Sequence, residues 1–523
     1  MTTSKSPSKS LSKSPKMPLR RLPSLIAVDR KSPKPLYQQV YDAYRAKIVR
    51  GELRSGQPVP STRELARELN VSRLPVLTAY SQLLAEGHFE SRTGSGTFVA
   101  ATIPARPRFE APSPFVPSKA PQSKTPESKT AARGTTVAEG ARPLSARARA
   151  LPGFERPSWA ESLGAFQVGQ PELRSFPMHL WSKLLMRYSR ELKVNALQYG
   201  DPLGLEELRQ AVATYLRTSR GVRCEPAQIM IVSGSQQALD ISTRVLLDPG
   251  ARVWVEEPGY WLVHHVLTAA GCAIVPVPVD SDGLDVSAGI KLCRGARAAF
   301  VAPSHQYPLG VTMSATRRFQ LLEWARQAGA WIIEDDYDSE YRYGSLPIAS
   351  LQGLDNHARV IYTGTFSKVL FPSLRLGYIV APFDLIGPFA AVRQSMDICP
   401  SHASQSVLAR FIQEGHFTRH IRKMRRVYEE RRGVLVEEIE RQLGSSCEIV
   451  GSAAGMHLTI LFRERFRDVD IAAKAAQRQL WLSALSLSYV GSAPRQGFVL
   501  GFGNASVTQI PGAVRLLKQL LKG

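Results

Sequence analysis

The stretch YTGTFSKVLFPSLRLGY (residues 362–378) carries a single lysine, Lys368, and an arginine, Arg375, seven residues after it. The apolar lead-in at residues 360–362 predicts a buried parallel strand that gives way to small and hydroxylic residues. A lysine at such a strand end can condense with an aldehyde if its surroundings keep the amine partly neutral. The arginine and the hydroxyl groups would suit a phosphate dianion. An aldehyde with a phosphate describes pyridoxal 5'-phosphate, although this stretch alone fits an exposed lysine after a strand equally well.

A second informative stretch, WIIEDDYDSE (residues 331–340), lies upstream of the lysine. An apolar strand is expected to end here in a cluster of carboxylates with a tyrosine among them. Pyridoxal phosphate withdraws electrons only while its ring nitrogen stays protonated, and that requires a carboxylate partner. A phenol near the ring oxygen would tune the bond between cofactor and lysine. Together the two stretches favour a site for this cofactor.

From about Leu151 the chain alternates apolar strands with amphipathic helices, which is the pattern of a doubly wound parallel sheet. Such sheets bind ligands at the carboxyl ends of their strands. After the strand at residues 229–232, Gly234 and Ser235 open a helix whose free N–H groups suit a phosphate, although a plain strand–helix turn is the alternative. After the next strand, Tyr260 could stack on a pyridine ring, although an aromatic residue there is more often part of a core.

The N-terminal part has a different pattern. Residues 36–51 have helical apolar spacing and end in a glycine. Ser61 and Glu64 predict a capping box for a second helix, and Ser72 predicts the cap of a third. Two short strands around a glycine-rich tip follow within residues 88–99. This order predicts a helix-turn-helix followed by a two-stranded wing.

The N-terminal pattern resembles the winged helix of GntR-type regulators, and the lysine and carboxylate stretches resemble the fold-type I aminotransferases. In combination, from Pro35 to the C-terminus apart from one linker, the chain resembles the MocR subfamily of GntR-type transcription factors. The resemblance implies a multidomain protein with four parts: a disordered basic arm (1–34), a winged helix-turn-helix DNA-binding domain (35–101), a flexible linker (102–150) and an α/β domain (151–523). The α/β domain would be a fold-type I aminotransferase-like domain that binds pyridoxal phosphate. It would end in a smaller α+β segment from about Asp384.

The resemblance also implies roles for individual residues. Lys368 would form the internal aldimine with the cofactor, and Asp335 rather than Asp336 would pair with the pyridinium nitrogen. The other expected cofactor contacts are Tyr337 at the phenolic oxygen, Arg375, Thr365, Gly234 and Ser235 at the phosphate, Tyr260 on the ring, Tyr307 where aminotransferases usually have an Asn beside the cofactor oxygen, and Tyr199 at the phosphate of the partner subunit.

By the same resemblance, Arg63, Ser72 and Arg73 would lie at groove and phosphate contacts, and Gly94, Ser95 and Gly96 would form a wing tip in the minor groove. An arginine at the N-terminal end of a recognition helix can pair bidentately with guanine or bind phosphate. The alternative for Arg63 and Arg73 is ordinary helix-surface charge.

Composition limits the possible classes of protein. The formal net charge of +23 predicts attraction to polyanions such as DNA, and 44% hydrophobic residues are ordinary for a globular protein. The five cysteines are scattered without metal-ligand spacing, so we expect no metal site and a reducing, cytoplasmic location. No apolar run approaches the length of a membrane span, and the Ser/Lys/Pro-rich N-terminus does not resemble a secretory signal.

The expected function is that of a DNA-binding transcriptional regulator whose aminotransferase-like domain senses an amine, an amino acid or pyridoxal phosphate itself. A homodimer would present two winged helix-turn-helix domains to paired half-sites in double-stranded DNA. The alternative is an active aminotransferase that carries a DNA-binding module. Many aminotransferases clamp the substrate carboxylate with an arginine in the strand that corresponds to residues 498–504. That strand and residues 485–489 contain no arginine, which favours at most half-transamination.

Overall fold

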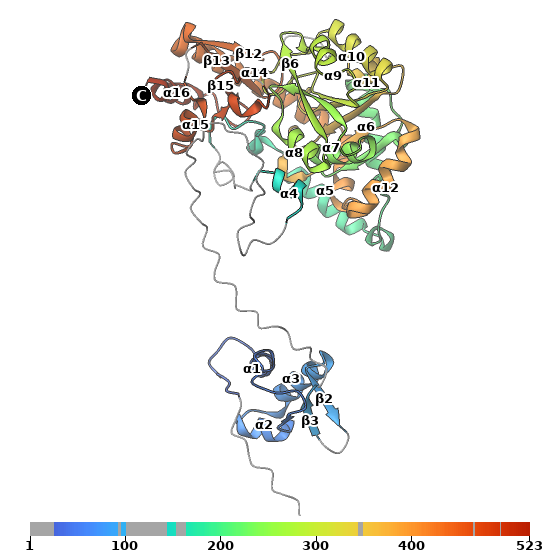
Figure 1. Cartoon of the computed structure of the whole chain (residues 1–523). Helices are drawn as coiled ribbons and strands as arrows, with labels where there is room; N and C mark the ends of the chain where they lie inside the picture. The colour runs from blue at the N-terminus through green and yellow to red at the C-terminus, as the bar shows by residue number, and fades with distance from the viewer. Residues whose placement is uncertain are drawn as a thin grey trace, which may run out of the picture. The chain divides into compact units, whose positions relative to one another are not determined.

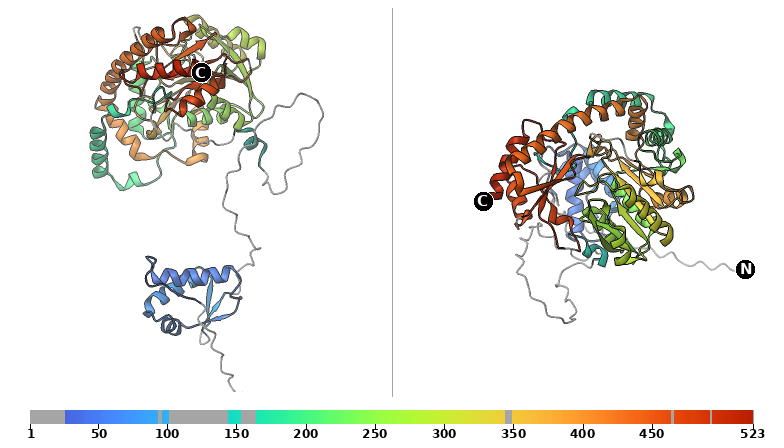
Figure 2. Two further views of the ribbon diagram at one scale, coloured as in Figure 1. Left: turned by 90° about the vertical axis from the view of Figure 1, so that its left-hand side faces the viewer. Right: turned by 90° about the horizontal axis from the view of Figure 1, so that it is seen from above.

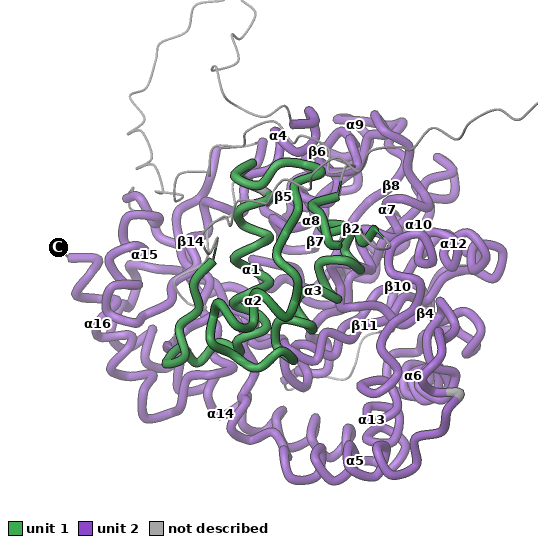
Figure 3. The backbone as a smooth tube through the Cα atoms, turned by 90° about the horizontal axis from the view of Figure 1, so that it is seen from below, with its two compact units in different colours: residues 1–135 green, residues 136–523 purple. Residues whose placement is uncertain are grey.

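The computed structural model describes residues 26–92, 96–100, 144–152, 164–343, 349–463, 466–491 and 493–522. The chain divides into two compact units, residues 1–135 and 136–523 (Figures 1 and 3). Each unit has its own buried apolar core. Within the described ranges, no helix is both long and apolar enough to cross a membrane.

The first unit is a small helical module with a three-stranded antiparallel sheet in the order β1-β3-β2. Its elements are α1 (Leu36–Val49), β1 (Pro58–Val59), α2 (Thr62–Glu68), α3 (Arg73–Ala85), β2 (Phe89–Arg92) and β3 (Gly96–Val99). Tyr44, Tyr80 and Phe89 meet edge to face in its core, with ring centroids 5.1–5.7 Å apart. The predicted helix-turn-helix and wing are thus both present.

The helix caps of this unit differ from one another. Ser61 accepts a hydrogen bond from the backbone N–H of Glu64, whose carboxylate accepts one in return, so the predicted capping box is confirmed. Ser72 occupies the N-cap position of α3, but its side chain makes no capping hydrogen bond. The hydroxyl of Ser72 is therefore not committed to the helix end.

The expected basic arm is described only from residue 26 onwards. Ile26 is buried in the core of the first unit, and the backbone N–H of Asp29 donates to Oε1 of Gln39 at 2.8 Å. Residues 26–34 therefore lie against α1, because two apolar side chains, Ile26 and Val28, dock there despite the basic surroundings. Residues 1–25 lie outside the described residues, as do Gly94, Ser95 and most of the expected linker.

The second unit is built on an eight-stranded sheet in the order β4-β11-β10-β9-β8-β5-β6-β7 (Figures 1 and 2). Its strands are β4 (Ile229–Val232), β5 (Arg252–Glu257), β6 (Ala273–Asp280), β7 (Gly283–Leu284), β8 (Ala298–Val301), β9 (Trp331–Asp336), β10 (Val360–Thr365) and β11 (Gly377–Val380). The strands from β10 to β6 in this order are parallel, as predicted, but β11 runs antiparallel to both neighbours and β7 to β6. The sheet is therefore mixed rather than purely parallel.

Helices alternate with these strands, as in α/β folds. They are α4 (Ala146–Ala150), α5 (Met178–Glu191), α6 (Glu206–Ser219), α7 (Ser235–Leu246), α8 (Trp261–Ala270), α9 (Val286–Cys293), α10 (Ala315–Ala328), α11 (Leu351–Leu354), α12 (Ile386–Asp397) and α13 (His402–Gln413). The short helix α4 falls inside the expected linker and packs against α8 of the second unit.

A long helix, α14 (His416–Leu443), leads into the smaller subdomain. There an antiparallel sheet in the order β12-β13-β15-β14 packs with α15 and α16, so the expected α+β segment is present. The elements are β12 (Cys447–Val450), β13 (His457–Phe462), α15 (Asp468–Ala476), β14 (Ser483–Ala484), β15 (Gly497–Gly501) and α16 (Ile510–Lys522).

Candidate cofactor site and DNA-binding face

Lys368 follows the carboxyl end of β10, at the edge of the sheet where the parallel strands end. Its Nζ donates to the backbone carbonyl of Gly169 at 3.0 Å. A Cβ atom at Gly169 would lie 2.6 Å from that Nζ, so a side chain at residue 169 would displace the amine from this position. Burial lowers the pKa of Lys368, and the nearby carboxylates of Asp338 and Asp335 partly oppose this. The neutral, nucleophilic form of this amine is therefore more accessible than that of an exposed lysine.

Asp335 and Asp336 are adjacent in β9 but have different surroundings. Asp336 is buried in an ion pair with Arg220, 2.7 Å between Nη2 and Oδ2, and also accepts from the hydroxyl of Tyr362. Asp335 accepts from Thr363 Oγ1 at 3.3 Å. Burial, reinforced by the charge of Asp336, raises the pKa of Asp335 to about 7. A pyridinium partner would favour the ionised form of Asp335, whereas Asp336 already has a cation beside it.

A pocket lies beside Asp335, at the ends of β5, β8 and β9. It is lined by Asp335, Tyr260, Val255, Phe300 and Ala302 among others. Tyr260 precedes α8, and its ring meets that of Tyr307 edge to face at 5.7 Å between centroids. The structure thus brings Asp335 and Tyr260 together in a largely apolar pocket that Glu256 and His264 also line, with Tyr307 packed against Tyr260.

The predicted phosphate residues converge at the start of α7. Gly234 is the N-cap with φ 90°, and Ser235 is the first helical residue. Arg375 donates from Nη2 to the carbonyl of Ser233 at 2.7 Å, and a Cβ at Gly234 would lie 3.2 Å from that nitrogen. Thr365 accepts from the backbone N–H of Ser367 at 3.2 Å. A guanidinium beside free helix N–H groups is a suitable seat for a phosphate.

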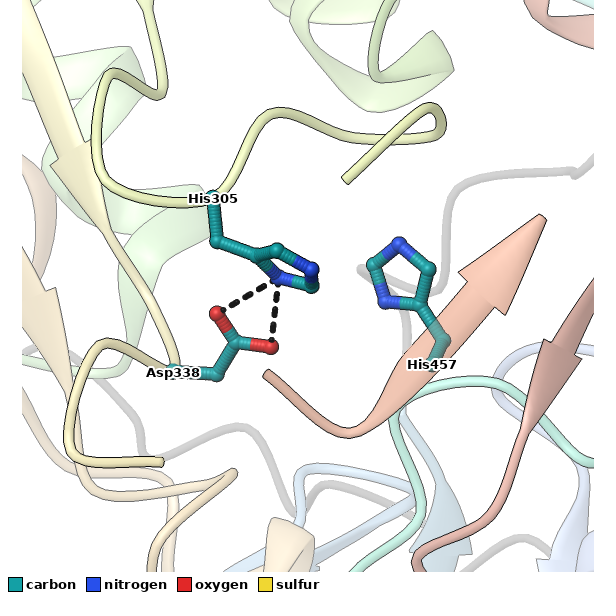
Figure 4. A group of neighbouring side chains, drawn as sticks. All are labelled: His305, Asp338 and His457. Atoms are coloured by element: carbon teal, nitrogen blue, oxygen red, sulfur yellow. Dashed lines mark hydrogen bonds and ion pairs between the residues drawn. The ribbon is translucent and has the colours of Figure 1, made fainter. Parts of the chain in front are cut away.

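A buried cluster of His305, Asp338 and His457 lies next to Tyr337 (Figure 4). His305 Nδ1 lies 3.1 Å from both carboxylate oxygens of Asp338 and 3.2 Å from the hydroxyl of Tyr337. His457 Nε2 lies 3.2 Å from the carbonyl of Pro308. The cluster could offer three ligand atoms within 4.8 Å of one another, and a hydrogen bond joins His305 to the hydroxyl of Tyr337.

Sequence reasoning did not assign this cluster or Gly169 to the site. Asp338 stands in the quoted WIIEDDYDSE stretch and could have been found from it, since Asp338 follows the same strand as Asp335. His457 comes from β13 in the smaller subdomain, and Gly169 precedes α5. Nothing in their local sequence points to Lys368.

Tyr199 is not among the residues that line the pocket. Its side chain is 83% exposed, next to Gly200, whose N–H donates to Sγ of Cys399. The strand that would carry a carboxylate-binding arginine, β15, contributes apolar residues only. Arg495 precedes it and lies 3.9 Å from Glu448.

The residues expected to contact DNA that the structure describes lie in the first unit. Arg63 on α2 and Arg73 at the start of α3 are both exposed, and Arg73 Nε donates to Thr62 Oγ1 at 3.2 Å. That bond links the first turns of the two helices. Gly96 begins β3 with φ 107°, a conformation that glycine adopts readily.

Comparison with known proteins agrees with both units. Residues 167–492 match the family model for aminotransferase class I and II, and residues 36–99 match that for bacterial regulatory proteins of the gntR family. The probable rhizopine catabolism regulatory protein MocR of Rhizobium meliloti is 40% identical over 479 residues, which are 91% of this chain and 92% of that protein. The chain belongs to the MocR subfamily of GntR-type regulators.

Other MocR-type relatives agree. The HTH-type pyridoxine biosynthesis transcriptional regulator PdxR of Corynebacterium glutamicum is 29% identical across 92% of this chain and 94% of its own length. Among solved structures, that of kynurenine aminotransferase of Pyrococcus horikoshii is similar to the second unit. The superposition covers 72% of this chain and 96% of the aminotransferase chain, with 28% identity and a TM-score of 0.67. The protein is therefore a DNA-binding transcriptional regulator with a fold-type I aminotransferase-like domain, a family whose aminotransferase members depend on pyridoxal phosphate.

Proposed function

We propose that this MocR-type regulator binds pyridoxal phosphate covalently at Lys368 and that a primary amine, an amino acid or the cofactor itself is the signal. The observation that carries the proposal is the buried Lys368 amine with a lowered pKa, beside Asp335 with a raised one. The lowered pKa of Lys368 favours the neutral amine that condenses with an aldehyde, and a pyridinium nitrogen beside Asp335 would return that carboxyl to its ionised form. When bound, the cofactor supplies an aldehyde carbon at which a free amine can compete with Lys368.

The residues present fit such a group. Arg375 and the N-terminus of α7 would hold the phosphate, Asp335 the ring nitrogen and Tyr337 the ring oxygen. Tyr260 and the apolar residues of the pocket would keep water from the ring. These residues come from the ends of several strands, with Asp335 and Tyr337 at β9, Tyr260 after β5 and α7 after β4, as in ligand sites of open α/β sheets.

Lys368 is also connected to the smaller subdomain through its hydrogen bond to Gly169. Its hydrogen-bond partner Gly169 follows a segment in which Phe166 pairs with Gly501 of β15 in the smaller subdomain. An amine that replaced Lys368 at the cofactor would return the lysine to this buried carbonyl and change the charge there. Two arrangements of the smaller subdomain that differ in this contact would then differ in ligand affinity, which is sufficient for a population shift.

We propose further that the protein is a homodimer. A set of large apolar side chains is exposed around α5 and the turn that follows it: Met178, Leu185, Met186, Val194, Leu197 and Tyr199. A patch of large exposed apolar residues along one stretch of chain is typical of an interface. Tyr199 lies on this patch, where a partner subunit could receive it.

The test uses the absorbance of the purified full-length protein. A cofactor bound to lysine should give a visible band that is lost in Lys368→Ala and retained in Lys474→Ala, which replaces an exposed lysine of α15. Addition of amines or amino acids should shift the band if an amine is the signal. If the signal is the cofactor itself, amines should leave the band unchanged and free pyridoxal phosphate should change DNA affinity. Persistence of the band in Lys368→Ala would contradict the assignment.

A further inference from the structure

The outward face of α3 carries two large apolar side chains in its first turns. Leu74 is 71% exposed and Leu77 is 43% exposed, and they stand three residues apart, which places them on neighbouring turns of one helix face. The core of the first unit takes Val76 and Tyr80 from α3 instead. The two leucines therefore contribute little to folding, and their exposure needs another explanation.

The polar side chains on the same face are mostly committed within the helix. Thr78 donates from Oγ1 to the carbonyl of Leu74 at 3.0 Å. Gln82 donates from Nε2 to Glu86 at 3.0 Å. Arg73 is tied by Nε to Thr62, which leaves its terminal nitrogens for phosphate or guanine. At Leu74 and Leu77 the face thus presents hydrocarbon, and the hydroxyl of the neighbouring Thr78 is already bonded within the helix.

We propose that Leu74 and Leu77 read the 5-methyl groups of thymines in the operator. The inference rests on the expectation, drawn from the resemblance to GntR-type regulators, that the N-terminal end of α3 enters the major groove. In that groove the thymine methyl is the apolar feature of a base-pair edge, whereas guanine, adenine and cytosine offer hydrogen-bonding atoms that a leucine cannot satisfy. Thymines should therefore be preferred at the one or two positions of each half-site that face these leucines.

The test isolates the methyl group. Double-stranded sites selected by the full-length protein from a random library are resynthesised with deoxyuridine in place of single thymines, a change that removes only the methyl. At the contacted thymines, wild-type affinity should fall about fourfold for each methyl removed, the value expected for one buried carbon group. The Leu77→Ala and Leu74→Ala variants should each lose this sensitivity at one position, which is a double-mutant cycle. Leu292→Ala, which shortens a leucine 58% exposed on α9 of the second unit, should retain it.

The outcomes separate the inference from its premise. If deoxyuridine sites bind as well as thymine sites while Arg73→Ala abolishes operator binding, α3 lies in the groove but does not read methyl groups. If both leucine variants keep the full deoxyuridine effect, other residues read the methyls and the proposal fails. If Arg73→Ala leaves operator affinity unchanged, the placement of α3 itself is wrong, and the leucine inference falls with it.

Discussion

Two neighbouring carboxylates show how local surroundings assign roles. Asp336 points to the side of the sheet that holds Arg220 and Tyr362, and its charge is neutralised in a buried pair. Asp335, one residue earlier in the strand, points to the opposite face, where the pocket and Lys368 lie. The alternation of side chains along a strand, rather than any chemical difference, separates a structural carboxylate from a candidate cofactor ligand.

The raised pKa of Asp335 predicts a pH dependence for the cofactor-free protein. Folding raises this pKa to about 7, whereas an aspartate in an unfolded chain titrates near 3.9. Between these values the folded state binds more protons than the unfolded state, so stability should fall as pH rises from about 4 to 7. The Asp335→Asn variant should lose this part of the slope. Urea midpoints at pH 5, 6 and 7 measure it.

Glu334 and Glu340, whose pKa values are also raised by burial to about 7, contribute slopes of the same sign in both proteins. The informative quantity is therefore the difference between wild type and Asp335→Asn at each pH. Midpoints that run parallel across the range would show that Asp335 titrates normally.

At the scale of elements, the two helix starts of the helix-turn-helix differ. The capping box of Ser61 and Glu64 satisfies backbone groups at the start of α2. Ser72 begins α3 without a capping bond from its side chain. Ser72 has the same side chain as Ser61 but lacks its capping bond, so its hydroxyl is available for another partner, and on a recognition helix that partner would be DNA.

Replacing the two serines should give opposite results. Ser61→Ala should destabilise the first unit by about 1 kcal/mol, the usual cost of losing an N-cap. Ser72→Ala should leave its stability nearly unchanged and weaken operator binding instead. Thermal unfolding together with DNA titration of each variant measures both effects. A large loss of stability in Ser72→Ala would mean that its hydroxyl supports the helix and would remove the reason to place it on DNA.

At the scale of the whole molecule, the apolar patch around α5 determines assembly in our proposal. Leu197, 71% exposed, stands within the patch beside Tyr199. Placing a charge there should split the dimer, because an interface centre tolerates unpaired charge poorly. Leu197→Asp should run at half the mass of the wild type in light scattering. The control variant Leu487→Asp, which replaces an exposed leucine in the smaller subdomain, should leave the mass unchanged. A wild-type protein that is monomeric at micromolar concentration would contradict the proposal.

Local patterns in the sequence were enough to predict the helix-turn-helix, the capping box of Ser61 and the α/β repeat, because each depends on residues close together in the chain. The same patterns predicted that Asp335 and Lys368 lie at the ends of two strands, and the structure shows that these strands, β9 and β10, are parallel neighbours. The antiparallel direction of β11 was not visible, because a short apolar strand reads alike in either direction.

The tertiary structure alone decided the surroundings of those residues. Gly169 beside Lys368, Arg220 beside Asp336 and His457 beside His305 each join segments remote in sequence. Their pairing follows from how the sheet, the smaller subdomain and the loops pack. Burial, which moves the pKa values of Lys368 and Asp335 toward each other, likewise belongs to the packed domain, because no stretch of chain excludes water from a charged group by itself.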